Sequence, residues 1–120
     1  MAMITAITAE GNTMSSRIAG TFARCAWFVL VDPAGGHVAF HENPFRQLPE
    51  QAGVSAVAFL AEKGVKKIIS GEFGDRIRNL TEEHHIQLVV ITDTNKTIGE
   101  IIDLLTSTFK KEASQTDDHP

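Results

Sequence analysis

Residues 27–42 have the sequence WFVLVDPAGGHVAFHE, and this stretch decides the fold of the chain. Its first residues are apolar and either aromatic or β-branched, which is typical of a strand. Asp-Pro-Ala-Gly-Gly at 32–36 is a strong turn signal, and residues 37–42 then alternate, with Val38 and Phe40 on one face. The stretch therefore predicts a β-hairpin.

Strand and helix patterns extend from this hairpin in both directions. Residues 3–9 predict a first strand, and residues 10–20 are rich in Gly, Asn, Ser and Thr, as in a long loop. Beyond the hairpin we expect helices at about 51–63 and 75–85, and strands at 67–70 and 88–92. The apolar run Leu88–Thr92 is of the kind buried on both faces. A last helix should follow Thr97-Ile98-Gly99-Glu100, which matches a capping box.

The predicted order is a meander of three strands followed by alternating helices and strands. This order favours an α/β fold in which a five-stranded mixed sheet has helices on both faces. With the first strand between the meander and the fourth strand, the sheet order becomes 3-2-1-4-5, which is a three-layer ribonuclease H-like topology. Residues 1–109 are expected to form this one domain, and residues 110–120 a flexible polar tail.

Composition argues against several functional classes. The chain is 42% hydrophobic and 22% charged, as in an ordinary globular domain, and its formal charge is −4 without a local basic stripe. Nucleic acid is therefore not an expected partner. No apolar run could cross a membrane, and Met1–Ala9 lacks the flank of a signal peptide, so we expect a cytoplasmic protein. The single cysteine excludes an internal disulfide and an all-cysteine metal cage within one chain.

A ligand site is expected at the carboxyl ends of the first and fourth strands, where the connections diverge. Topology brings to this edge Ser15, Ser16, Arg17, Arg24, Cys25, Gly71 and Gly74. Backbone N–H groups of the two glycines could bind an anion beside a helix N-terminus, although a plain tight turn explains them equally well.

Cys25 and His41 could supply metal ligands at the same edge. Cys25 follows the permanent cation of Arg24, so it could be a soft ligand, but a small core residue is an equal alternative. For His41 an ordinary strand-face histidine is the simpler interpretation. No base for nucleophilic catalysis is evident, and the first strand lacks the carboxylates of a two-metal nuclease, so we expect no enzyme.

Several short motifs occur in order along most of the chain. They are Gly11-Asn12, Ser16, Phe22-Ala23-Arg24, Phe28–Asp32, Glu42-Asn43-Pro44, Gly64-Val65 and Gly71-Glu72-Phe73-Gly74. With these motifs the chain resembles, over about residues 3–106, the dinitrogenase iron–molybdenum cofactor biosynthesis family of NifX and NifB C-terminal-like domains. The resemblance implies a ribonuclease H-like fold without nuclease activity, which binds, carries or stores a preformed metal–sulfur cluster.

Within this family the chain is similar to the orange-protein branch, whose noncovalently held cluster is a molybdenum–copper sulfide. This similarity implies an anionic cluster of that kind as the cofactor and a MinD-like P-loop ATPase as a partner. Topology and the resemblance together give the expected cofactor-binding positions as Asn12, Ser16, Arg17, Phe22, Arg24, Gly71, Phe73 and Gly74, with Cys25 and His41 as candidate metal ligands. The alternative is a regulatory protein-interaction module of the same fold that binds no cluster.

The chain departs from the family where members usually read His-Phe-Gly-Arg-Ala. Here the sequence is Thr21-Phe22-Ala23-Arg24-Cys25, so a histidine ligand is lost and Ala23 stiffens a permissive backbone position. Either Cys25 replaces the missing donor, or an anionic thiometalate is held by Arg17, Arg24 and backbone N–H groups. The second route needs no protein ligand, because the cluster supplies its own sulfide.

Overall fold

The predicted hairpin is present in the computed structural model, which describes residues 4–32 and 36–106. Strands β2 (Trp27–Asp32) and β3 (His37–Glu42) pair antiparallel from Trp27 opposite Glu42 to Asp32 opposite His37. The middle of the turn and the predicted polar tail, residues 110–120, lie outside the described residues.

The sheet has the predicted order, β3-β2-β1-β4-β5. The central strand β1 (Ile4–Ala9) pairs antiparallel with β2 and parallel with β4 (Val65–Ser70), which in turn pairs parallel with β5 (Gln87–Val90). The chain is thus a five-stranded mixed sheet with the ribonuclease H-like strand order.

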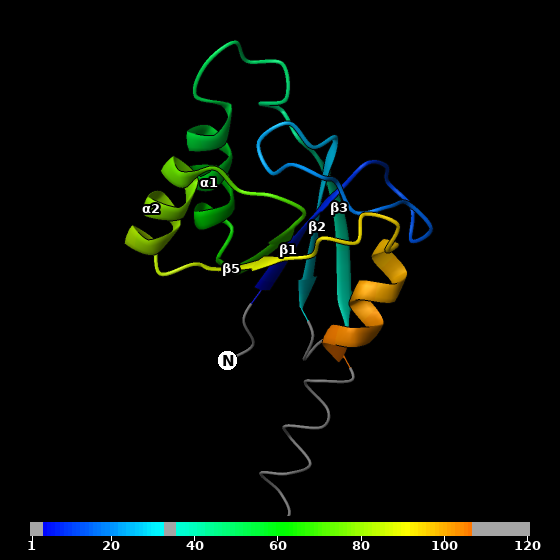
Figure 1. Ribbon diagram of the computed structural model, residues 1–120. Helices are drawn as coiled ribbons and strands as arrows, with labels where there is room; N and C mark the ends of the chain where they lie inside the picture. Colours follow the sequence, from blue (N-terminus) through cyan, green and yellow to red (C-terminus); the bar gives the residue numbers. More distant parts are fainter. Residues whose placement is uncertain (1–3, 33–35, 107–120) are drawn as a thin grey trace, which may run out of the picture.

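Helices cover both faces of the sheet, so the molecule has three layers (Figure 1). Helices α1 (Ala52–Glu62) and α2 (Asp75–Glu83) lie on one face, and a helix described from residue 98 to 106 lies on the other. Because neighbouring strand residues point to opposite faces, Ala6, Phe28 and Ile68 join one buried cluster. Ile7, Val29 and Ile69 join the other, beneath Ile98 and Ile101.

Local sequence signals set the helix ends as expected. Gly64 follows α1 with φ +83°, a left-handed conformation that costs glycine little. The capping box is formed: Thr97 donates its backbone N–H to Glu100 Oε1 (3.1 Å), and the backbone N–H of Glu100 donates to Thr97 Oγ1 (3.3 Å).

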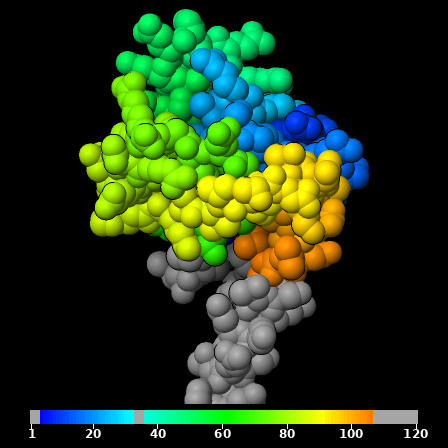
Figure 2. All heavy atoms as spheres, in the orientation of Figure 1, coloured from blue at the N-terminus to red at the C-terminus, as the bar shows by residue number. Residues whose placement is uncertain are grey.

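The fifth strand differs from the prediction. The sequence suggested a strand at 88–92 buried on both faces, but β5 is a short edge strand in which Leu88 and Val89 are half-buried and Val90 is 43% exposed. Figure 2 shows the yellow segment around β5 at the surface of the molecule. An edge strand has one neighbour, so an apolar run alone does not guarantee burial. In the described part of the chain, no helix has the length and hydropathy needed to cross a membrane.

Candidate functional site

The carboxyl ends of β1, β3, β4 and β5 and the start of β2 meet at one edge of the sheet (Figure 1). The segments that follow or precede these ends are residues 10–26, 43–51, 71–74 and 91–97. This is the edge at which the topology predicts a ligand, because ligands of open α/β sheets bind beyond the carboxyl ends of strands.

The crevice between β1 and β4 is filled by the protein's own backbone. Ile18 forms a bridge with Ala9, and Ala19 donates its N–H to Thr8 O (2.9 Å) while its carbonyl accepts the N–H of Gly71 (3.1 Å). Beneath this contact, two buried hydroxyls meet where Thr8 Oγ1 donates to Ser70 Oγ (2.8 Å). The N–H of Gly71 is therefore bonded within the protein, which contradicts its predicted use as an anion donor.

Gly71 instead allows two backbones to touch. A Cβ atom at this position would lie 2.7 Å from the carbonyl oxygen of Gly20 and 2.8 Å from its Cα. No side chain fits at that distance. Gly71 therefore serves the close approach of residues 18–20 to the end of β4.

Phe22 and Phe73 continue the same contact one step further along both segments. Their ring centroids are 5.7 Å apart, and the side chains are 2% and 7% exposed. Phe22 also packs 6.0 Å from the ring of Phe28. Both were predicted as cofactor-binding residues, but the structure places them in the core, where they hold segments 20–23 and 71–74 side by side.

We use the name junction surface for the exposed positions of these two segments and of the first turn of α2, and define it by Thr21, Glu72, Gly74 and Arg76. All four residues are exposed. Gly74 is the N-cap of α2 (φ −75°, ψ 160°), and a Cβ built on it would meet nothing within 4 Å. The first-turn N–H groups of α2 begin beside Gly74, and the charged residues Glu72, Asp75 and Arg76 next to it in the chain are exposed.

The two predicted arginines serve different loops. Arg17 forms a bridge with Thr97 beside the capping box. Arg24 uses Nη1 to donate to the backbone carbonyls of Arg46 (2.8 Å) and Leu48 (2.6 Å). In this arrangement Arg24 fastens the loop between β3 and α1 and leaves only its other N–H groups for a ligand.

Cys25 is buried in the core. Its side chain is 3% exposed, and burial raises the pKa of the thiol from 9.0 to about 12, despite the opposing effect of a hydrogen bond from the Asn43 side chain. In the metal-free protein such a thiol stays protonated, and its burial keeps it away from the surface at which a ligand would arrive. Of the two alternatives for Cys25, the structure therefore supports the core residue.

The remaining predicted positions lie on β3 and in the loop after β1. His41 lies on β3 opposite Phe28 and is half-buried. Ser16 accepts the backbone N–H of Thr13 at Oγ (3.2 Å) and so shapes the loop in which Asn12 is exposed. Over residues 4–32 and 36–106, no group of three or more His, Cys, Asp or Glu side chains could hold a metal ion.

Asn43 is a structural residue that the sequence did not identify by role. It is 4% exposed, and its amide nitrogen donates to the carbonyls of Ala23 (3.1 Å) and Cys25 (2.9 Å) while its Oδ1 accepts the N–H of Phe45 (2.9 Å). The pattern Glu-Asn-Pro directly after a strand was the available signal, because Asn side chains often bond the backbone two residues on.

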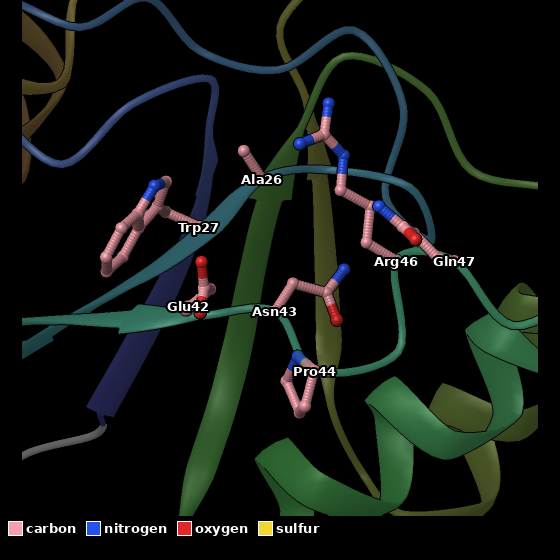
Figure 3. Close-up of a pocket in the computed structure, with 7 residues that line it drawn as sticks. All are labelled: Ala26, Trp27, Glu42, Asn43, Pro44, Arg46 and Gln47. Carbon is pink, nitrogen blue, oxygen red and sulfur yellow. The ribbon is translucent and has the colours of Figure 1, made fainter.

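A hollow of about 360 Å³ lies beside Asn43, at the start of β2 and the end of β3 (Figure 3). We call it the β2–β3 hollow. It is lined by Ala26, Trp27, Glu42, Asn43, Pro44, Arg46 and Gln47. Sequence reasoning placed His41 at this edge, but it did not indicate that a concave site would form beside it.

Comparison with known proteins agrees with this architecture. Residues 3–108 match the model of a family described as dinitrogenase iron-molybdenum cofactor. The apo form of the orange protein from Desulfovibrio gigas has a TM-score of 0.80 and 24% identity, with 90% of each chain covered. A putative NifB protein from Thermotoga, assigned to the DUF35 family, has a TM-score of 0.74 and 26% identity over 89% of each chain. No curated protein sequence matches the chain.

Proposed function

Because this chain belongs to the dinitrogenase iron-molybdenum cofactor family, we propose that it binds and carries an anionic metal–sulfur cluster at the junction surface. Membership supports a role in cofactor binding or carriage rather than catalysis. The finer proposal is a molybdenum-containing cluster, with the molybdenum–copper sulfide implied by the orange-protein resemblance as its first candidate. The cluster is cargo, and it arrives with its own sulfide ligands.

One observation carries the location. Gly20 packs on Gly71 and Phe22 packs on Phe73, so Thr21 and Glu72 are presented on the outer side of two segments whose inner sides are fixed. Thr21 stands where family members usually have histidine, and it is exposed beside the N-terminus of α2. A helix N-terminus offers unpaired N–H groups and a positive potential to an anion.

The residues present fit such cargo in part. Arg76 and the first-turn N–H groups of α2 favour a negative cluster, while the carboxylates of Glu72 and Asp75 oppose it. Cys25 is buried and does not enter the proposal as a ligand. Binding would therefore rest on hydrogen bonds to sulfide and on charge, and it should weaken with salt.

The test is reconstitution without air. Protein is mixed with tetrathiomolybdate and Cu(I), passed through a desalting column, and analysed for molybdenum, copper and the visible spectrum. Retention of a chromophore with stoichiometric metal is expected; a colourless, metal-free protein under all mixing ratios would refute the proposal.

Paired variants test the location. Arg76→Ala should lower cluster retention and Glu72→Gln should raise it, because each changes one charge at the junction surface. Arg78→Ala and Glu82→Gln, which are exposed on α2 beyond its first residues, serve as matched controls. If the test variants behave as their controls while wild type retains the cluster, the cargo binds elsewhere.

The partner and the alternative function stay predictions. A MinD-like P-loop ATPase would deliver or receive the cluster in this proposal, so its binding should depend on cluster loading. An interaction module without cargo would bind its partner equally well in the cluster-free form. Exposed Met14, Val90 and Leu104 supply apolar surface for either contact.

A further inference from the structure

The β2–β3 hollow carries two opposite charges that do not pair with each other. Glu42 and Arg46 both line it, and neither side chain makes an ion pair or side-chain hydrogen bond with another described residue. In Figure 3 the Glu42 carboxylate lies toward Trp27, whereas the Arg46 guanidinium lies apart from it, near Ala26. Opposite charges that face one hollow without closing on each other leave room for a ligand between them.

One wall of the hollow suits a cation. Trp27 and Glu42 are direct partners in the antiparallel register, so their side chains leave the sheet on the same face. An indole ring next to a carboxylate binds an ammonium or guanidinium group through its π face and through charge. Glu42 is exposed and Trp27 half-buried, so both are accessible from solvent.

The other wall suits a carboxylate. Arg46 and Gln47 supply a guanidinium and an amide, which are donors of the kind that bind carboxylate oxygens. The backbone of this wall is fixed, because Arg24 donates to the carbonyl of Arg46 and Asn43 donates to those of Ala23 and Cys25. The side chain of Arg46 is thus free to contact a ligand while its main chain is held.

We propose that the β2–β3 hollow binds a small zwitterion of the amino-acid class, with its ammonium group against Trp27 and Glu42 and its carboxylate against Arg46. A volume of about 360 Å³ is at the lower end of the range typical of small-molecule pockets. The Glu42 carboxylate disfavours a purely anionic ligand such as a thiometalate. The hollow is therefore a second site, separate from the junction surface.

The chain offers a direct probe, because Trp27 is its single tryptophan. Wild-type protein is titrated with glycine, β-alanine, 4-aminobutyrate and 6-aminohexanoate while its intrinsic fluorescence is followed, and calorimetry repeats each titration. At least one of these zwitterions should give a saturable change, with an optimum chain length set by the two walls. Acetate and methylammonium carry one charge each, so both should bind at least roughly tenfold more weakly than the best zwitterion.

Charge variants assign the walls. Glu42→Gln and Arg46→Gln should each weaken binding of the best zwitterion by about tenfold or more, since charge-assisted bonds are the stronger ones. Both side chains are exposed, and Arg46→Gln keeps the backbone carbonyl that Arg24 binds, so the fold should be retained. Glu50→Gln and Arg78→Gln are exposed controls outside the hollow.

Three outcomes would overturn the proposal. The first is that no zwitterion of the series gives saturable binding by either method. The second is that acetate binds as well as the zwitterions, which would show that the Arg46 guanidinium alone accounts for binding. The third is that the control variants weaken binding as much as Glu42→Gln and Arg46→Gln. Each readout is independent of cluster binding, so the two proposals can fail or succeed separately.

Discussion

Asn43 donates its side-chain amide to the backbone carbonyl of Cys25 over 2.9 Å, and so joins the end of β3 to the segment that enters β2. The same nitrogen reaches the carbonyl of Ala23. In the opposite direction, Arg24 donates two hydrogen bonds to backbone carbonyls of the loop after β3. Residues 23–25 and 43–48 thus hold each other through side chains from both sides.

Asn43→Ala should lower the free energy of unfolding by about 2–4 kcal/mol, because it leaves the carbonyls of Ala23 and Cys25 without their donor. Asn43→Asp, which keeps the shape but offers no amide hydrogens, should be at least as destabilising. Urea unfolding measures both, with Asn79→Ala on the exposed side of α2 as the control. Equal midpoints for Asn43→Ala and wild type would contradict this role.

Cys25 should make the protein less stable at high pH. The folded state keeps the thiol protonated to about pH 12, whereas the unfolded chain releases the proton near pH 9.0. The unfolded state therefore binds fewer protons between these values, and stability falls as pH rises through that window. Unfolding experiments from pH 8 to pH 11 should show a smaller fall for Cys25→Ala than for wild type.

The thiol should also react slowly. At pH 8, native protein should be modified by a thiol reagent far more slowly than urea-unfolded protein, because the side chain is 3% exposed and protonated. Labelling of native and unfolded protein at the same rate would show that the core around Cys25 opens readily.

Gly71→Ala should destabilise the fold by about 1–3 kcal/mol, since its Cβ would overlap the Gly20 backbone, which has no flexible side chain to move away. Gly74→Ala is the matched control in the same turn, because its Cβ would occupy open space and only the helix cap would suffer. Thermal unfolding compares the two. A Gly71→Ala variant no less stable than Gly74→Ala would refute the close contact.

The capping box gives a prediction with an electrostatic readout. Thr97→Ala should cost about 1 kcal/mol of stability through loss of the cap. The backbone and then the side chain of Thr97 lower the pKa of Glu100 from 4.5, with a smaller contribution from Lys96, 3.8 Å away. Because this pKa is lowered on folding, the Glu100 carboxylate stabilises the fold above pH 4.5, and this stabilisation is lost as the pH falls below that value. In NMR titrations the pKa of Glu100 should rise when Thr97 is replaced.

The sequence predicted the fold because its signals were local. The turn at 32–36, the glycine at 64 and the capping box each depend on residues close in the chain, and the strand order follows from how such units connect. The exception was β5. The burial of Leu88 and Val89 depends on which parts of the protein pack beside the edge strand. The hydrophobic pattern within the strand does not indicate this.

The sequence predicted which segments meet at the candidate site but not the structural contacts of their residues. Topology predicted which segments meet at this edge, yet Gly71 binds Ala19 and Arg24 binds Arg46, contacts that join residues far apart in sequence. Phe22 and Phe73 appeared as ligand contacts because motif membership does not distinguish a residue that touches cargo from one that supports the loop. Cys25 showed the same ambiguity, and only its burial resolved it.

The contact between Gly20 and Gly71 separates the two segments around it into inward positions that pack and outward positions that are exposed. The inward positions are constrained by folding, because the two backbones are in contact there and no larger side chain fits. Their outward neighbours, Thr21 and Glu72, take no part in that contact and are exposed. The outward positions can therefore be substituted while the packing of the inward ones stays unchanged, so the chemistry of this surface can vary at little cost in stability.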